Sequence, residues 1–163
     1  MFHNIVYDVC TFDQLRQLAE PSNWKLVVLD VYADWCGPCK KLKPFFEQLA
    51  NEPSYMNNVL FLKCNIDRID NDLIEYLPDI SSLPTVLFMD HEGRVLDRVE
   101  GLQVEKIQMT IDQCLEMVDK EERINFSKKN TNIDMDDDGD RQPQRKSKSL
   151  PVSRQDTQET VYY

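Results

Sequence analysis

The sequence predicts an α/β fold in which a central mixed β-sheet is flanked by helices. Short apolar runs of strand length alternate with segments of helical periodicity, which is typical of consecutive β-α-β units. A turn signal then separates two further strand patterns, which indicates an antiparallel hairpin, and a last helical pattern follows. The chain has 163 residues, of which 41% are hydrophobic, and this is enough for one folded domain.

The predicted alternation begins with a strand over Phe2–Tyr7. Thr11 has the residue type of a helix N-cap, and Gln14, three residues later, completes a capping box. The helix that they start is expected to end near Ala19. An apolar run over Lys25–Tyr32 then predicts a buried strand.

The central part of the chain continues this alternation. Apolar residues at helical spacing predict a helix over Cys36–Ala50. The apolar segment Val59–Asn65 predicts the third strand, and Asn71–Leu77 predicts a short helix. A β-α-β-α-β unit of this kind places parallel strands in the sheet.

The remaining elements are a hairpin and a helix. Strand patterns over Thr85–Asp90 and Arg94–Val99 flank His91-Glu92-Gly93, a short connection that contains a glycine. Apolar residues recur on one helical face over Val104–Val118, which predicts a helix that packs on the sheet.

The composition changes after about residue 120. We predict one folded domain over residues 1–120 and a polar, disordered tail over residues 121–163, because few large apolar side chains occur there to offset the entropy of ordering. The tail contains an acidic block, 134–140, and then a basic block, 141–148. We interpret it as a solvated segment. The alternative is a localisation or partner-docking segment whose basic block serves nuclear import.

Charge and targeting patterns argue against several classes of protein. The net charge of −10 argues against nucleic-acid binding through a general electrostatic footprint. No run approaches 18 apolar residues, so no membrane span is predicted, and the N-terminal residues lack the pattern of a signal or transit peptide. Five cysteines, an odd number, argue against a secreted disulfide framework. We expect a cytoplasmic protein, with the nucleus as a second location.

Two cysteines, Cys36 and Cys39, stand at the junction between the second predicted strand and the helix that follows it. A helix N-terminus offers free N–H groups and a partial positive charge, which stabilise a thiolate. Cys36 lies in the exposed first turn and is expected to be the attacking thiol, with Cys39, one turn deeper, as the resolving thiol. The alternative is half of a zinc site. The sequence holds only two histidines, His3 and His91, and no second C-x-x-C, so no metal site is predicted.

Asp30 interrupts the apolar run of the second predicted strand. Burial of an unpaired carboxyl raises its pKa, so Asp30 is expected to hold a proton. Beneath the two cysteines it is expected to accept the proton of Cys39 during resolution, directly or through a water. The alternative is that Asp30 points to solvent at the end of the strand.

These residues resemble those of the thioredoxin family. The hexapeptide Trp35-Cys36-Gly37-Pro38-Cys39-Lys40 matches the family's active-site motif in full, and Asp30 stands where thioredoxins carry a buried acid. Further matches follow in order within residues 1–120: Pro44, Lys63, Leu83-Pro84-Thr85, Gly93 and Gly101. The resemblance implies a thioredoxin fold for this segment, and it says nothing about the tail.

The resemblance also implies the remaining members of the site. Pro84 is expected to follow a cis peptide bond and to pack against the cysteines. Lys63 is expected to face Asp30 and to modulate it. A docking patch for substrate is expected around Cys36, formed by Trp35, Gly37, Pro38, Leu83, Gly101 and Leu102.

The function that follows is protein-disulfide reduction by dithiol–disulfide exchange, which maintains cell redox homeostasis. No bound cofactor is expected. Since the sequence has no glycine-rich dinucleotide loop, electrons are expected to come from NADPH through a thioredoxin-reductase-like partner. The other partners are protein disulfide clients, and a monomer is expected. The alternatives are a specialised redox regulator whose tail chooses its partners, and a non-catalytic binding module that keeps only the scaffold.

Overall fold

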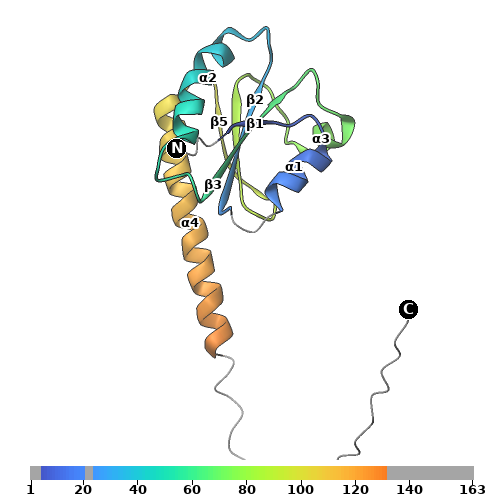
Figure 1. The fold of residues 1–163 in the computed structure, drawn as a ribbon. Helices are drawn as coiled ribbons and strands as arrows, with labels where there is room; N and C mark the ends of the chain where they lie inside the picture. The colour runs from blue at the N-terminus through green and yellow to red at the C-terminus, as the bar shows by residue number, and fades with distance from the viewer. Residues whose placement is uncertain (1–4, 21–23, 132–163) are drawn as a thin grey trace, which may run out of the picture.

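The protein is described here by a computed structural model, which describes residues 5–20 and 24–131 (Figure 1). The order of strands and helices within these ranges agrees with the predicted alternation. The elements are β1 (Tyr7–Asp8), α1 (Phe12–Ala19), β2 (Leu26–Tyr32), α2 (Gly37–Ala50), β3 (Val59–Asn65), α3 (Asn71–Tyr76), β4 (Thr85–Met89), β5 (Val95–Glu100) and α4 (Val104–Thr131).

The strands form one mixed sheet in the order β1-β3-β2-β4-β5. β1, β3 and β2 run parallel, whereas β4 pairs antiparallel with β2 and β5 pairs antiparallel with β4. The predicted central mixed sheet, with its parallel unit and its hairpin, is therefore confirmed. Because β2 and β3 are parallel, the loops that follow them meet at one edge of the sheet, which is where α/β proteins place their sites.

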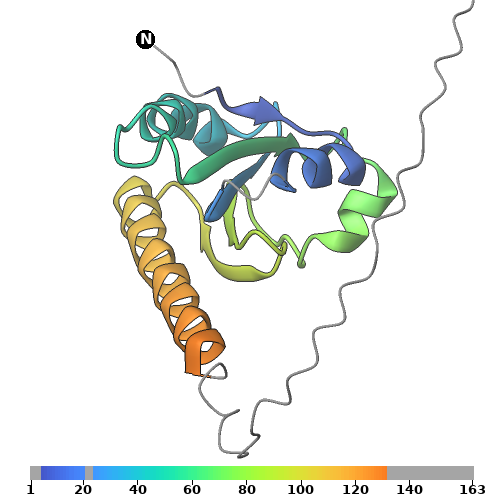
Figure 2. The same cartoon turned by 60° about the horizontal axis from the view of Figure 1, so that its bottom comes forward.

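Two hydrophobic cores lie on the two faces of the sheet. Figures 1 and 2 show α2 and α4 on one face and α1 and α3 on the other. Side chains alternate along β2, so that Val28 belongs to the core under α2 and α4 and Leu29 to the core under α1 and α3. Phe46 of α2 packs edge to face on Phe61 of β3, with ring centroids 5.4 Å apart. Burial of aromatic rings of this size stabilises each layer by about 2 to 3 kcal/mol per side chain.

The predicted capping box at the start of α1 is confirmed. The Thr11 hydroxyl accepts the backbone N–H of Gln14 at 3.1 Å, and the Gln14 side-chain oxygen accepts the N–H of Thr11 at 3.3 Å and that of Cys10 at 2.8 Å. These bonds satisfy donors that a helix start leaves without intrahelical partners, which typically stabilises it by about 1 kcal/mol.

The first strand is shorter and later than predicted. The sequence predicted a strand over Phe2–Tyr7, but β1 consists of Tyr7 and Asp8, and Ile5 and Val6 lie outside it. Residues 1–4 lie outside the described residues. Among the described residues β1 is an edge strand that pairs with β3, with Tyr7 opposite Leu62 and Asp8 opposite Lys63.

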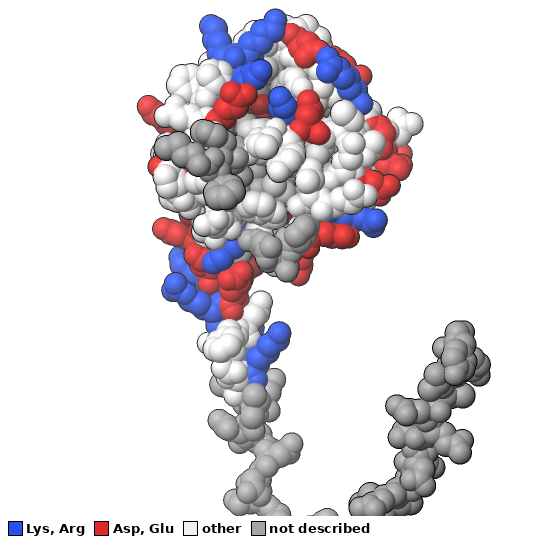
Figure 3. Space-filling model, viewed as in Figure 1, with Lys and Arg blue, Asp and Glu red and all other residues white. Residues whose placement is uncertain are grey.

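The last helix is longer than predicted. Its buried face holds Ile107, Ile111, Cys114 and Val118, and the prediction ended it at the last of these, but α4 continues to Thr131. Beyond Val118, α4 contacts the rest of the domain through ion pairs rather than through apolar packing. Lys25 contacts Asp119 at 2.6 Å and Glu122 at 3.7 Å, and Arg94 contacts Glu121 at 3.1 Å. Figure 3 shows acidic and basic side chains gathered where α4 leaves the sheet.

The predicted boundary at residue 120 falls inside α4, so regular structure continues into the segment for which none was predicted. The acidic block 134–140 and the basic block 141–148 lie outside the described residues. Within the described ranges, no helix is both long and apolar enough to cross a membrane.

Candidate active site

Cys36 and Cys39 form a disulfide at the N-terminus of α2, with their Cα atoms 5.3 Å apart. Cys36 is the N-cap residue, and its Sγ accepts the backbone N–H of Cys39 at 3.2 Å. Pro38 stands in the first turn of the helix, where its missing N–H has no consequence for the helical hydrogen bonds. The local sequence therefore places a sulfur atom where a helix presents free N–H groups and partial positive charge.

The two cysteines are almost equally buried, which corrects the prediction that Cys36 lies in an exposed first turn. The exposed fraction is 5% for Cys36 and 4% for Cys39. Ala33 belongs to the same buried cluster, and Leu83 and Ile66 pack against it from loops that are distant in sequence. Position in the helix still separates the cysteines, because Cys36 caps α2 whereas Cys39 lies inside it.

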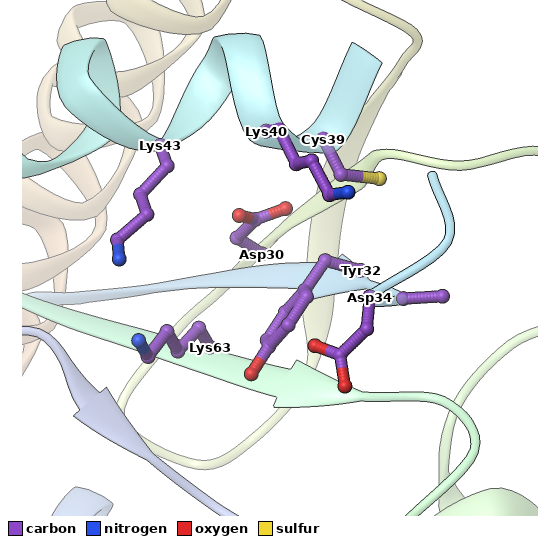
Figure 4. Close-up of a pocket in the computed structure, with 8 residues that line it drawn as sticks. Asp30, Tyr32, Asp34, Cys39, Lys40, Lys43 and Lys63 are labelled. Atoms are coloured by element: carbon purple, nitrogen blue, oxygen red, sulfur yellow. The ribbon is translucent and has the colours of Figure 1, made fainter. Parts of the chain in front are cut away.

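Asp30 lies in β2 and lines a cavity of about 410 Å³ together with Cys39 of the disulfide (Figure 4). Its exposed fraction is 5%, and its Oδ1 atom is buried without a hydrogen-bond partner. Burial raises the pKa of Asp30 to about 7, although the nearby Lys63 ammonium group acts in the opposite direction. The alternative that Asp30 points to solvent is therefore wrong, and the site holds a carboxyl group that titrates near neutral pH.

Lys63 lies directly opposite Asp30 in the parallel pair of β2 and β3. Register partners in neighbouring parallel strands present their side chains on the same face, and both residues line the cavity. The Lys63 Nζ atom lies 5.9 Å from the centroid of the Tyr32 ring. The neighbourhood of Lys63 and Asp30 that the resemblance implied is thus present in the structure. Lys40 and Lys43 of α2 line the same cavity.

The Leu83–Pro84 peptide bond is cis, as the resemblance implied. Leu83 packs against the cysteine cluster, and the carbonyl of Pro84 accepts the N–H of Gly101 at 2.7 Å. Gly101 has a φ of 80°, a conformation that favours glycine, so it turns the chain beside Pro84. Leu102 follows with an exposed fraction of 40%. The loop before β4, which reaches the cysteines through Leu83, is therefore joined to the loop after β5 by the hydrogen bond between Pro84 and Gly101.

Trp35 is 71% exposed and stands directly before Cys36, and Gly37 and Pro38 after Cys36 are exposed as well. The Trp35 ring adds apolar surface to the rim around the buried disulfide. The predicted members of the docking patch that flank Cys36 in sequence are thus accessible. Leu83, a further predicted member of the patch, packs on the cysteine cluster.

Sequence reasoning missed Asp67 and Arg68, which follow β3 and hold the segment before Cys36. Asp67 accepts the indole N–H of Trp35 at 2.8 Å, and Arg68 forms an ion pair with Asp34. The signal that could have found them is topological. Two parallel neighbouring strands end at the same edge, so the loops after β2 and β3 must lie close together.

The described residues offer no group of three or more His, Cys, Asp or Glu side chains that could hold a metal ion. In the zinc alternative both cysteines would be ligands, but here they are bonded to each other. What the site can do chemically is exchange a disulfide, with a carboxyl group of near-neutral pKa in the same cavity as Cys39.

Comparisons with known proteins agree with this chemistry. The sequence model of the family described as Thioredoxin matches residues 10–113. The chain is 40% identical over 103 residues to Thioredoxin-T of Drosophila melanogaster, a match that covers 63% of this chain and 62% of that protein. It is 38% identical over 109 residues to Thioredoxin H1 of Arabidopsis thaliana, covering 67% of this chain and 90% of that protein.

A solved structure gives the same result. The crystal structure of a thioredoxin of Malassezia sympodialis superposes with a TM-score of 0.59 at 32% sequence identity, and the match covers 69% of this chain and 92% of that one. The fold that carries the disulfide at the N-terminus of α2 is therefore shared with a solved structure.

Proposed function

This chain belongs to the thioredoxin family of protein-disulfide oxidoreductases, and we propose that its disulfide is returned to the dithiol by a partner reductase that oxidises NADPH. The chain is a protein-disulfide reductase that works through the pair Cys36 and Cys39. The single observation that carries this function is the disulfide at the N-terminus of α2, beside a cavity that holds a buried carboxyl group.

The reaction is a pair of thiol–disulfide exchanges in which Cys36 acts first. Its thiolate attacks one sulfur of a client disulfide, so that a mixed disulfide forms and the first client thiolate leaves. The thiolate of Cys39 then attacks the Cys36 sulfur, and the second client thiolate leaves. Two electrons pass to the client, and the bond between Cys36 and Cys39 is the oxidised product. The helix position of Cys36 supports its role as the attacking thiol, because the free N–H groups stabilise a thiolate there.

Asp30 is the proton acceptor for Cys39 in this proposal. It shares the cavity with Cys39, its carboxyl has no hydrogen-bond partner at Oδ1, and the cavity is large enough for water to bridge the two groups. A general base works best when its pKa is near the working pH, and the pKa of Asp30 is raised to about 7. Lys63 modulates this group, because its positive charge favours the carboxylate form.

The client binds in an extended form over the rim of the disulfide. This docking patch is formed by Trp35, Gly37, Pro38, Leu83, Pro84, Gly101 and Leu102. Two features support it. The rim exposes apolar surface at Trp35 and Leu102, and the loop at Leu83 offers backbone groups to an extended chain.

The source of electrons is proposed from chemistry. The sequence has only four glycines and no glycine-rich dinucleotide loop, so a reductase that binds NADPH must supply the electrons. A cytoplasmic location, with the nucleus as a second one, is proposed from the odd number of cysteines and the reducing chemistry.

A monomer is proposed as the working form. The non-catalytic alternative is not favoured, because both cysteines and Asp30 are in place.

The test uses the full chain with NADPH, a thioredoxin reductase and insulin as the disulfide substrate. Consumption of NADPH should require Cys36, and Cys36→Ser should lower the rate at least a hundredfold, because the attacking thiolate is lost. Cys39→Ser should instead accumulate a mixed disulfide, which mass spectrometry locates on Cys36. The matched control is Cys10→Ser, because Cys10 lies outside the disulfide cluster and should leave the rate unchanged. Trapping of clients on Cys10 or Cys114 in the Cys39→Ser variant would contradict the assignment.

A further inference from the structure

A row of three charged residues crosses the parallel part of the sheet. Asp8 of β1 lies opposite Lys63 of β3, and Lys63 lies opposite Asp30 of β2. Side chains at register positions of parallel strands share a face, so the Lys63 side chain stands between two carboxyl groups. The two differ in surroundings, because Asp8 is exposed whereas Asp30 is 5% exposed.

Tyr32 holds Asp8 on this face. Its hydroxyl donates to Asp8 Oδ2 at 3.0 Å, which spans from β2 to β1 across β3. Lys63 lies on the strand between them, with its Nζ atom 5.9 Å from the Tyr32 ring centroid. Within the described residues no direct ion pair commits Lys63 to either carboxyl group. By register, the Lys63 side chain therefore lies on the same face as an outer and an inner acid and between their strands.

We propose that Asp8 is a positioning residue that competes with Asp30 for the Lys63 ammonium group, and so sets how readily Asp30 releases and accepts its proton. The proposal rests on the proposed role of Asp30 as the proton acceptor and adds a residue that has no contact with the disulfide. The Asp8 carboxylate attracts the Lys63 ammonium group, and this weakens the effect of that positive charge on Asp30. The inner carboxyl then keeps its proton more readily.

Removal of the charge at Asp8 should lower the pKa of Asp30 through two effects that act in the same direction. Lys63 lowers the pKa of Asp30 against the larger effect of burial. Loss of the negative charge at Asp8 frees Lys63 for Asp30, and it also removes a like charge from the neighbourhood, so both changes favour the Asp30 carboxylate. The other titratable or charged groups around this row come from β2, β3, α2 and the adjoining loops: Tyr32, Asp34, Cys39, Lys40, Lys43, Cys64 and Arg68.

The experiment is a carboxyl ¹³C NMR titration of Asp30 in the full-length reduced protein. Asp8→Asn removes the charge and keeps an oxygen that can accept from Tyr32, and it should move the Asp30 titration to lower pH by roughly half a pH unit. The matched control is Asp13→Asn on α1, an exposed acid paired with Arg16 on the other face of the sheet, which should leave the titration unchanged. Tyr32→Phe keeps the charge at Asp8 and frees its carboxylate, and it should give a smaller shift than Asp8→Asn.

The role of Lys63 is tested by repeating the titration in a Lys63→Met background. There the shift caused by Asp8→Asn should shrink to less than half, because only the direct effect of Asp8 remains. An unchanged Asp30 titration in Asp8→Asn, or an equal shift in the Lys63→Met background, would overturn the proposal. Failure of the proposed role of Asp30 as proton acceptor would give a different result. In that case Asp30→Asn leaves the rate of insulin reduction unchanged, whatever the titration shows.

Discussion

Trp35 donates its indole N–H to the carboxylate of Asp67 at 2.8 Å, and this bond ties the residue before the attacking cysteine to the loop after β3. Asp34 and Arg68, the neighbours of these two residues, form an ion pair beside it. The most exposed aromatic ring of the site is thus held by a polar contact at its edge, while its face stays accessible. Its orientation depends on a loop that no pattern near Trp35 in the sequence points to.

Replacement of Asp67 should weaken client docking. Asp67→Ala removes the acceptor for the Trp35 indole and should lower kcat/KM for insulin reduction about three- to tenfold, mainly through KM, because a typical hydrogen bond contributes about 1 kcal/mol and this one is exposed. Asp67→Asn keeps an acceptor oxygen and should stay within about twofold of the natural protein. Steady-state kinetics of the three proteins decide the matter. An equal loss of kcat/KM in the Ala and Asn variants would show that client docking depends on the negative charge of Asp67 and not on its hydrogen bond to Trp35.

Asp30 should make the protein less stable as the pH rises. Its pKa is about 7 in the folded protein and 3.8 in the unfolded reference, so the folded state binds the proton more tightly. The contribution of Asp30 to the free energy of unfolding is then greatest below about pH 4, falls between about pH 4 and 7, and does not change above pH 7. This interval corresponds to on the order of 4 kcal/mol. Asp30→Asn does not titrate and should be more stable than the natural protein at pH 8 by about 2 to 4 kcal/mol. Urea unfolding at pH 5 and pH 8 measures this, and equal pH slopes in both proteins would contradict it.

The same variant should slow catalysis. Asp30→Asn removes the proposed acceptor for the Cys39 proton and should lower kcat for insulin reduction about ten- to a hundredfold near pH 7, where a base of this pKa is most effective. The matched control is Asp34→Asn, which also lines the cavity but is exposed and paired with Arg68. A comparable loss in both variants would point to the charge of the cavity in general rather than to Asp30.

The polar end of α4 should contribute little to stability. A chain ending after Lys120 keeps the buried face down to Val118 and loses the ion pairs of Glu121 and Glu122, so reductase activity should be unchanged and the melting temperature should fall by only a few degrees. The matched control is a chain ending after Thr131, which keeps the described helix. Loss of activity or of cooperative unfolding in the shorter chain would show that residues 121–131 belong to the folding unit.

A side chain at Gly93 should destabilise the fold. Its φ is 83°, and a methyl group there would overlap the hydroxyl of Tyr76. Gly93→Ala should therefore lower the free energy of unfolding by about 1 to 3 kcal/mol, with reductase activity unchanged below the melting transition. Tyr76→Phe removes the overlapping hydroxyl together with its hydrogen bond to the Gly93 carbonyl, so Gly93→Ala should cost less stability in the Tyr76→Phe background than in the natural protein. Thermal unfolding of the single and double variants checks this, and full stability of Gly93→Ala would refute it.

Local signals predicted the parts of the fold that local chemistry decides. The capping box of Thr11 and Gln14 needs only neighbouring residues, and the alternation of β2, α2 and β3 follows from apolar periodicity. The buried position of Asp30 also followed from its apolar neighbours. The prediction that Lys63 faces Asp30 depended on the family resemblance, because the register between two strands cannot be predicted from the sequence of either strand alone.

The remaining features depend on contacts between distant segments. Cys36 is buried because Leu83 and Ile66 pack on its cluster, and no pattern around Cys36 reveals this. α4 passes Val118 in a stretch without a buried apolar face, where Lys25, far away in sequence, supplies ion pairs. The bond from Tyr32 to Asp8 likewise spans two strands that are separated by a third.

The length of α4 has a practical consequence for how the enzyme can be held. Figure 1 shows the helix leaving the domain in the direction opposite to the carboxyl end of β2, where the disulfide lies. From Val118 to Thr131 the helix advances about 20 Å at 1.5 Å per residue. A helical extension of this length can serve as an attachment site. A surface, a label or a second protein attached at the far end of α4 should therefore lie away from the disulfide, and we expect an enzyme tethered there to keep its activity.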